Sequence, residues 1–215
     1  MSRSLIAAAA AAALLAACAT PTRNPTSFFV TSANPGKGAD FGGLEGADRY
    51  CQALGTAAGA GHRQWRAYLS AAPSGGAPAV NARDRIGRGP WFNVKGTLIA
   101  YNVNELHAAP NISKQTALTE KGEMVSGRGD AVNLHDVLTG SKPDGTLATG
   151  TGDTTCRNWT SSGEGSAIVG HHDRLGLSDD APAKSWNASH VTRGCSLDAL
   201  KSTGGGGRLY CFAAD

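Results

Sequence analysis

Four cysteines constrain the fold of this 215-residue chain more than any other feature of its sequence: Cys51, Cys156, Cys195 and Cys211. Two disulfides can join four cysteines in three ways, and the sequence leaves all three open. In a nested arrangement, an outer Cys51–Cys211 bridge would tie the two ends of one domain together. In the loop-entropy account, closing loops of that length stabilises the folded state by about 4–5 kcal/mol per bridge.

The first 17 residues predict a secretory signal peptide. Arg3 precedes an apolar run that is too short for a stable membrane span, and small residues come just before Cys18. Leu-Ala-Ala-Cys at residues 15–18 resembles the lipobox of bacterial lipoproteins, whose cysteine is lipidated, for example with palmitate, and becomes the first mature residue. The alternative is an ordinary signal peptide cut near Ala17 or Ala19, which leaves Cys18 as a free thiol.

The lipoprotein interpretation divides the chain into three parts. Residues 1–17 would be the signal peptide, residues 18–26 the lipid anchor and a proline-bearing tether, and residues 27–215 one domain with its own core. Ala19 lacks the acidic side chain that retains lipoproteins at the inner membrane in some bacteria. We therefore expect a protein of the bacterial cell envelope that is anchored in the outer membrane.

Composition and local pattern predict a loop-rich α+β domain. With 29 glycines and only 6% aromatic residues, turns and bridges would organise the chain more than a large aromatic core. The net charge of +3 is too small to indicate a nucleic-acid partner, and a secretory signal argues against one. Two helices are expected, over residues 44–54 with Cys51 and over residues 81–86. Short, mostly antiparallel strands are expected near residues 28–31, 65–69, 158–161, 167–170 and 209–213.

Residues 102–155 predict a long loop region. Apolar residues become sparse there, and Gly, Asn, Asp, Ser, Thr and Pro dominate. Because a loop of this length in a compact domain is more often functional than idle, we expect a ligand site on this side of the domain.

The order of these motifs resembles the C-type lectin-like fold, and within it the endostatin domain of certain collagens. The shared stretches are Trp-Arg-Ala-Tyr-Leu-Ser at 65–70, Val-Asn-Ala-Arg-Asp at 80–84, Thr-Gly-Ser-Lys-Pro-Asp-Gly at 139–145 and Cys-Arg-Asn-Trp at 156–159. No single motif is strongly specific, and the likeness lies in their order and spacing. The resemblance implies nested disulfides, Cys51–Cys211 and Cys156–Cys195.

The resemblance also indicates where a calcium-dependent sugar site would lie, although a shared fold does not establish an activity. In sugar-binding members of the superfamily, a Glu/Gln-Pro-Asn/Asp triplet and a Trp-Asn-Asp triplet supply calcium ligands. The corresponding triplets here are Lys-Pro-Asp at 142–144 and Trp-Asn-Ala at 186–188.

Both triplets depart from the family pattern. Lys142 places an ammonium group where calcium needs an oxygen, and Ala188 lacks a carboxylate. Asp144, Trp186 and Asn187 remain candidate ligand-binding residues, with calcium as a candidate ion. The alternative is that Pro-Asp-Gly forms a turn and that Trp186 is a core residue.

Arginines of the predicted short helix offer a different route to a ligand. Arg83 and Arg85 carry guanidinium groups, which suit sulfate, phosphate and carboxylate. Because endostatin-like domains bind sulfated polysaccharide, the resemblance implies an anionic glycan as a candidate ligand. The alternative is a solvated helix face on which Asp84 offsets part of the charge.

Histidines and carboxylates near the carboxyl end offer ligands that zinc prefers. Because adjacent side chains of a strand point to opposite faces, at most one of His171 and His172 would join a given site. The alternative is a structural role in which Asp173 fixes a histidine tautomer. The candidate metal ligands are His171, His172, Asp173 and His190, with His135 and Asp136 as a further source.

These patterns support one leading function and two alternatives. The leading hypothesis is a membrane-anchored, extracytoplasmic recognition module that binds a carbohydrate or a protein, such as a surface or matrix protein, through its long-loop face. The first alternative is a structural envelope lipoprotein without a ligand, and the second is a metal-dependent enzyme. No Gly-x-Ser-x-Gly elbow marks a nucleophile, and the mature cysteines are better explained as bridges, so no catalytic residue is predicted.

Overall fold

The computed structural model describes residues 24–150 and 152–215. The predicted signal peptide and Cys18 lie outside these residues. Within the part of the chain that is described, no helix has the length and apolar character needed to cross a membrane.

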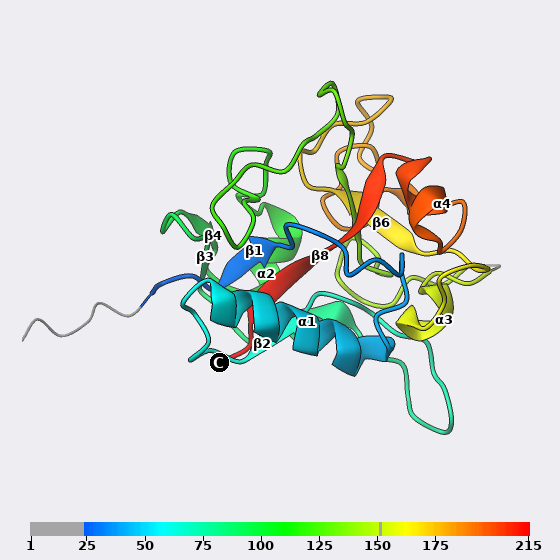
Figure 1. Cartoon of the computed structure of the whole chain (residues 1–215), viewed down its shortest axis with the longest axis horizontal. Coiled ribbons are helices and arrows are strands. Elements are labelled where there is room, and N and C mark those ends of the chain that lie inside the picture. Colours follow the sequence, from blue (N-terminus) through cyan, green and yellow to red (C-terminus); the bar gives the residue numbers. More distant parts are fainter. Residues whose placement is uncertain (1–23, 151) are drawn as a thin grey trace, which may run out of the picture.

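The described residues form an α+β fold around one mixed sheet (Figure 1). β8 lies at its centre and pairs antiparallel with β1 and β2 and parallel with β5, while β5, β6 and β7 continue the sheet through antiparallel pairs. β3 and β4 form a separate two-stranded sheet. The strands are β1 (Phe28–Val30), β2 (Trp65–Ala67), β3 (Trp91–Phe92), β4 (Leu98–Ala100), β5 (Asp136–Leu138), β6 (Ile168–His171), β7 (His190–Val191) and β8 (Gly205–Ala213).

In residues 24–150 and 152–215, four helices accompany the sheet, whereas two were expected from the sequence. The predicted helix that carries Cys51 is present as α1, which runs beside β2 and β8 in Figure 1. The second predicted helix is a single 3₁₀ turn, Ala82–Asp84. The four helices are α1 (Gly43–Ala57), α2 (Val103–Ala108), α3 (Cys156–Trp159) and α4 (Leu197–Lys201).

The central strand is buried on both faces. Leu209 and Cys211 belong to the core cluster on the side of α1, whereas Tyr210 and Phe212 belong to a second cluster that contains Trp91. This division follows from the alternation of side chains along a strand. The apolar Leu-Tyr-Cys-Phe run therefore supplies both halves of the core.

The nested disulfide pairing is confirmed. Cys51 of α1 is bonded to Cys211 of β8, with their Cα atoms 5.6 Å apart. Cys156 of α3 is bonded to Cys195, just before α4, at a Cα separation of 5.7 Å. The outer bridge thus attaches the longest helix to the central strand.

The strand predicted at residues 158–161 is wrong, because Asn158 and Trp159 end α3 and residues 160–161 follow it without forming a strand. All four residues of α3 have positive φ angles, between 47° and 66°, and the turn is therefore left-handed. This conformation costs roughly 1–2 kcal/mol per residue that is not glycine. Three hydrogen bonds fix it: Asn158 accepts from the Ala72 N–H and donates to the Ala72 carbonyl, and the Trp159 indole donates to the Ser70 carbonyl.

Candidate functional site

The face suggested by the lectin triplets is held together by internal hydrogen bonds. The buried Asn187 amide donates to the carbonyls of Lys142 and Pro143, at 3.1 and 3.2 Å, and its oxygen accepts from the Ser185 hydroxyl. The exposed Asp144 carboxylate accepts from the backbone and hydroxyl of Thr146. These contacts stabilise the loop and use the amide group that a ligand would need.

Trp186 lies in the core, with 3% of its surface exposed. Its ring packs against Tyr68 and Tyr210, with centroids 4.8 and 5.2 Å away. The segment at 184–188, which includes Trp186, lines part of an adjoining surface cavity of about 470 Å³. The indole therefore acts as a packing element of the sheet face.

Arg83 and Arg85 also serve the fold. The Arg85 guanidinium is largely buried and lies 2.7 Å from the Asp48 carboxylate, and it donates to the Ala67 carbonyl at 2.6 Å. Arg83 donates to the Asp144 carbonyl at 2.8 Å. Arg85 thus attaches the 3₁₀ turn to α1 and β2, and Arg83 attaches it to the loop at Asp144.

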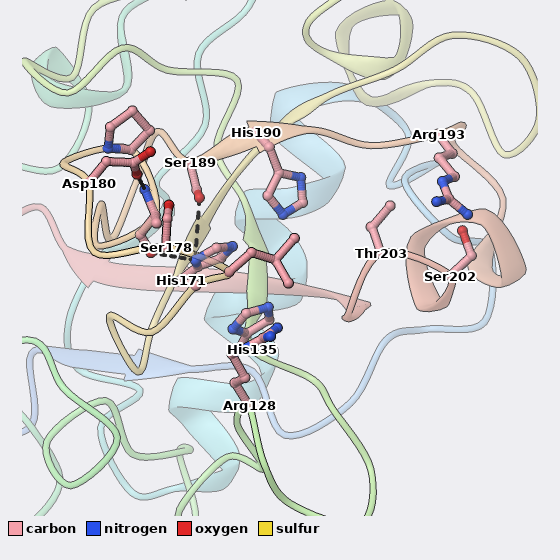
Figure 2. Close-up of a pocket in the computed structure, with 14 residues that line it drawn as sticks. Arg128, His135, His171, Ser178, Asp180, Ser189, His190, Arg193, Ser202 and Thr203 are labelled. Atoms are coloured by element: carbon pink, nitrogen blue, oxygen red, sulfur yellow. Dashed lines mark hydrogen bonds between the residues drawn. The ribbon is translucent and has the colours of Figure 1, made fainter.

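A different cavity, of about 490 Å³, combines the long loop with the carboxyl-terminal segments (Figure 2). We call this cavity the histidine pocket. The long loop contributes two of its residues, and β6, β7 and the segments around them contribute most of the others. The pocket is lined by Arg128, His135, His171, Gly176, Leu177, Ser178, Asp180, Pro182, Ala183, Ser189, His190, Arg193, Ser202 and Thr203.

The order of the strands brings three histidines to one carboxylate. Asp136 of β5 is paired with His171 of β6, and cross-strand partners project to the same face. β7 follows β6 in the sheet and starts at His190, while His135 directly precedes β5. The Nε2 atoms of His135, His171 and His190 lie 3.2, 3.3 and 3.4 Å from Asp136 Oδ1.

This cluster is buried and incompletely hydrogen-bonded. Asp136 and His171 are 2% and 3% exposed. Among the described residues, neither carboxylate oxygen of Asp136 nor Nε2 of His171 has a hydrogen-bond partner of acceptable geometry. An ionised carboxylate in such a place needs a compensating positive charge.

This arrangement shifts the pKa values of Asp136 and His190. Burial alone would raise the pKa of Asp136, but the surrounding imidazoles of His171, His190 and His135 lower it below its ordinary value. The Asp136 carboxylate in turn raises the pKa of His190 above its usual value, against the effect of partial burial. The cluster therefore favours a negative Asp136 with a positive charge beside it.

The structure separates the four predicted metal ligands into two groups. His171 and His190 meet at Asp136, whereas the Asp173 carboxylate lies 3.3 Å from Nδ1 of His135, behind the cluster. Burial would raise the pKa of Asp173, but His135 and backbone N–H groups lower it to about 2. His172 is buried near the Ser126 carbonyl, and burial lowers its pKa to about 4.

Comparisons with known proteins do not assign this chain to a family. Neither a comparison with protein-family models nor one with curated proteins finds a match. The function therefore has to be inferred from the chemistry of the site.

Arg128 and Arg193 are two pocket residues that the sequence did not indicate. Both are exposed at the histidine pocket, where Figure 2 places Arg128 beneath His135 and Arg193 near Ser202 and Thr203. No motif marks either arginine, because they are 65 positions apart by their numbering and meet only through the fold. The pocket thus combines imidazoles at its base with guanidinium and hydroxyl groups around them.

Proposed function

We propose that this protein is a membrane-anchored, extracytoplasmic recognition module with a C-type lectin-like, endostatin-like domain, and that its ligand binds in the histidine pocket. The observation that carries the proposal is the pocket itself, an open cavity of about 490 Å³ to which the long loop contributes. The α+β architecture and the nested disulfides agree with the resemblance in the order of motifs.

The lining of the pocket favours a saccharide that carries a carboxylate. Guanidinium groups such as those of Arg128 and Arg193 bind carboxylates through paired, charge-assisted hydrogen bonds. Hydroxyl groups of Ser189 and Thr203 can exchange hydrogen bonds with sugar hydroxyls. Leu177, which is 91% exposed, offers an apolar surface to a sugar ring.

An array of neutral and acidic glycans, probed with the purified protein, tests this proposal. We expect binding to glycans with carboxylate groups, and we expect Arg193→Ala and Arg128→Ala each to weaken it at least tenfold, or about 1.4 kcal/mol, through loss of a charge-assisted contact. Arg49→Ala is the matched control, because Arg49 is an exposed arginine on α1, outside the pocket.

Two outcomes would contradict a saccharide ligand. The first is the absence of binding to every acidic glycan, and the second is binding that Arg193→Ala and Arg49→Ala leave equally strong. Binding to a matrix-protein array with the same dependence on Arg193 would assign the pocket to a protein ligand instead.

The anchor is proposed from Cys18, in Leu-Ala-Ala-Cys. In a bacterial host, Cys18→Ala is expected to move the protein from the detergent phase to the aqueous phase of a Triton X-114 partition, because the acyl chains supply most of the membrane affinity. Ala19→Ser, one residue further on, should leave the partition unchanged. Mass spectrometry that finds an unmodified thiol at Cys18 in the wild-type protein would refute the anchor.

A further inference from the structure

The base of the histidine pocket has the geometry of a cation site. Three imidazole nitrogens converge on Asp136 Oδ1 at 3.2, 3.3 and 3.4 Å, yet none of them makes a well-aligned hydrogen bond with it. A tetrahedral zinc ion with bonds of about 2.0–2.1 Å separates its ligand atoms by about 3.3–3.4 Å. The three distances to Oδ1 therefore match those between a carboxylate oxygen and nitrogen ligands of one metal ion.

Acceptor oxygens beside the three Nδ1 atoms orient the imidazoles. Nδ1 of His135 lies beside the Asp173 carboxylate, Nδ1 of His171 beside the Ala183 carbonyl and Nδ1 of His190 beside the Val191 carbonyl, at 3.3, 2.8 and 3.1 Å. These oxygens can only accept, so a proton on each Nδ1 satisfies them. In that tautomer the three Nε2 atoms, which lie nearest to Asp136, are unprotonated and free to bind a metal.

Three unprotonated nitrogens this close to an anion repel it unless a cation lies among them. Protonation of one imidazole would supply a single donor and would leave the other two lone pairs opposed to Asp136. The rings of His135 and His171 are stacked, with centroids 4.0 Å apart, so two positive charges there would repel each other. One divalent cation satisfies all four groups at once.

The donor set selects the kind of metal. Ligand atoms of His135, Asp136 and His171 all lie within 4.8 Å of one another. His190 lies outside that group, but its Nε2 is 3.4 Å from Asp136 Oδ1, close enough to supply a fourth ligand. Three imidazoles with one carboxylate suit zinc and similar transition metals, whereas calcium and magnesium prefer sites made of oxygen atoms.

We propose that His135, Asp136, His171 and His190 bind one Zn²⁺ ion at the base of the histidine pocket, with Asp173 orienting His135. This site deepens the proposed recognition function by placing a cation beside the ligand. It does not depend on that function, because zinc binding is measured without any glycan. The two proposals can therefore fail separately.

Calorimetric titration of the purified full-length chain with Zn²⁺, after removal of metals with a chelator, tests the site. We expect one ion per chain, a higher melting temperature in its presence, and the intense visible absorption of tetrahedral Co²⁺ when cobalt replaces zinc. Asp136→Asn and His190→Ala should each lower the affinity more than 100-fold. Asp173→Asn, which acts through His135, should lower it about 10–100-fold.

His62→Ala is the matched control, because His62 is exposed and does not line the pocket. Near-ultraviolet circular dichroism establishes that each variant is folded. If Asp136→Asn does not fold, His190→Ala carries the test, since its side chain is 35% exposed and its removal leaves the core intact. A wild-type chain that binds no zinc at micromolar concentration, or a His190→Ala variant with the affinity of His62→Ala, would overturn the proposal.

Discussion

Replacing both Cys51 and Cys211 with alanine is expected to lower the free energy of unfolding by about 5 kcal/mol, which is the loop-entropy value for a bridge across 160 residues. Removing the inner Cys156–Cys195 bridge should cost about 4 kcal/mol, because its loop spans only 39 residues. Domains of this size are stable by roughly 5–15 kcal/mol. Loss of the outer bridge should therefore unfold a large fraction of the protein at physiological temperature.

Urea denaturation followed by tryptophan fluorescence measures this loss. The wild-type protein in a reducing agent provides the matched comparison, because reduction opens both bridges without changing a side chain. Ser202→Ala, at an exposed position beside α4, should leave the midpoint unchanged. If the free energy of unfolding of the double alanine variant decreases by less than about 1 kcal/mol, the bridge contributes little to the stability of the fold.

Asp48→Ala is expected to lower the free energy of unfolding by about 3–5 kcal/mol, because it leaves a buried guanidinium without its counter-ion. The Asp48 carboxylate on α1 accepts from Arg85 at 2.7 Å, from Arg66 at 2.8 Å and from the backbone N–H of Ala67 at 2.9 Å. The side chain of Arg85 is only 12% exposed, and burial lowers its pKa while Asp48 opposes that effect. This carboxylate therefore connects α1, β2 and the 3₁₀ turn.

Thermal and urea denaturation of two matched variants separates this effect from a general effect on α1. Glu45→Ala removes another carboxylate of the same helix, but its pair with Arg49 is exposed and should contribute less than about 0.5 kcal/mol. Arg66→Ala should cost no more than about 1 kcal/mol, because Arg66 is more exposed than Arg85 and leaves Asp48 paired. If Asp48→Ala and Glu45→Ala are equally stable, the buried ion pair has no net role.

The elements predicted correctly are those whose signal is local. Residues 44–54 carry a helical repeat with Cys51 on its inner face, and the structure places that helix at α1. The run at 28–31 is a short apolar strand, present as β1. α3 was missed because its left-handed turn depends on distant groups, the carbonyl of Ser70 and the backbone of Ala72.

For the candidate site, the sequence could predict the residue types but not their arrangement. The sequence indicated histidines and carboxylates suited to zinc, including His171 and His190. It could not show that His171 and His190 meet at Asp136 while Asp173 lies beside His135, because that arrangement depends on the register in which β5 pairs with β6. Residue types can be read from a sequence, whereas the pairing of strands is a property of the whole sheet.

The central position of β8 determines when the molecule can fold. β1 and β2 pair with a strand that is synthesised more than a hundred residues after them, and among the described strands neither has another partner, so both await residues 205–213. The same strand supplies Cys211 to the outer bridge and lies beside Asp136. Before β8 emerges, β1 and β2 present unpaired strand edges that can aggregate. Sheet, bridge and pocket base are therefore completed together, in one late step of biogenesis.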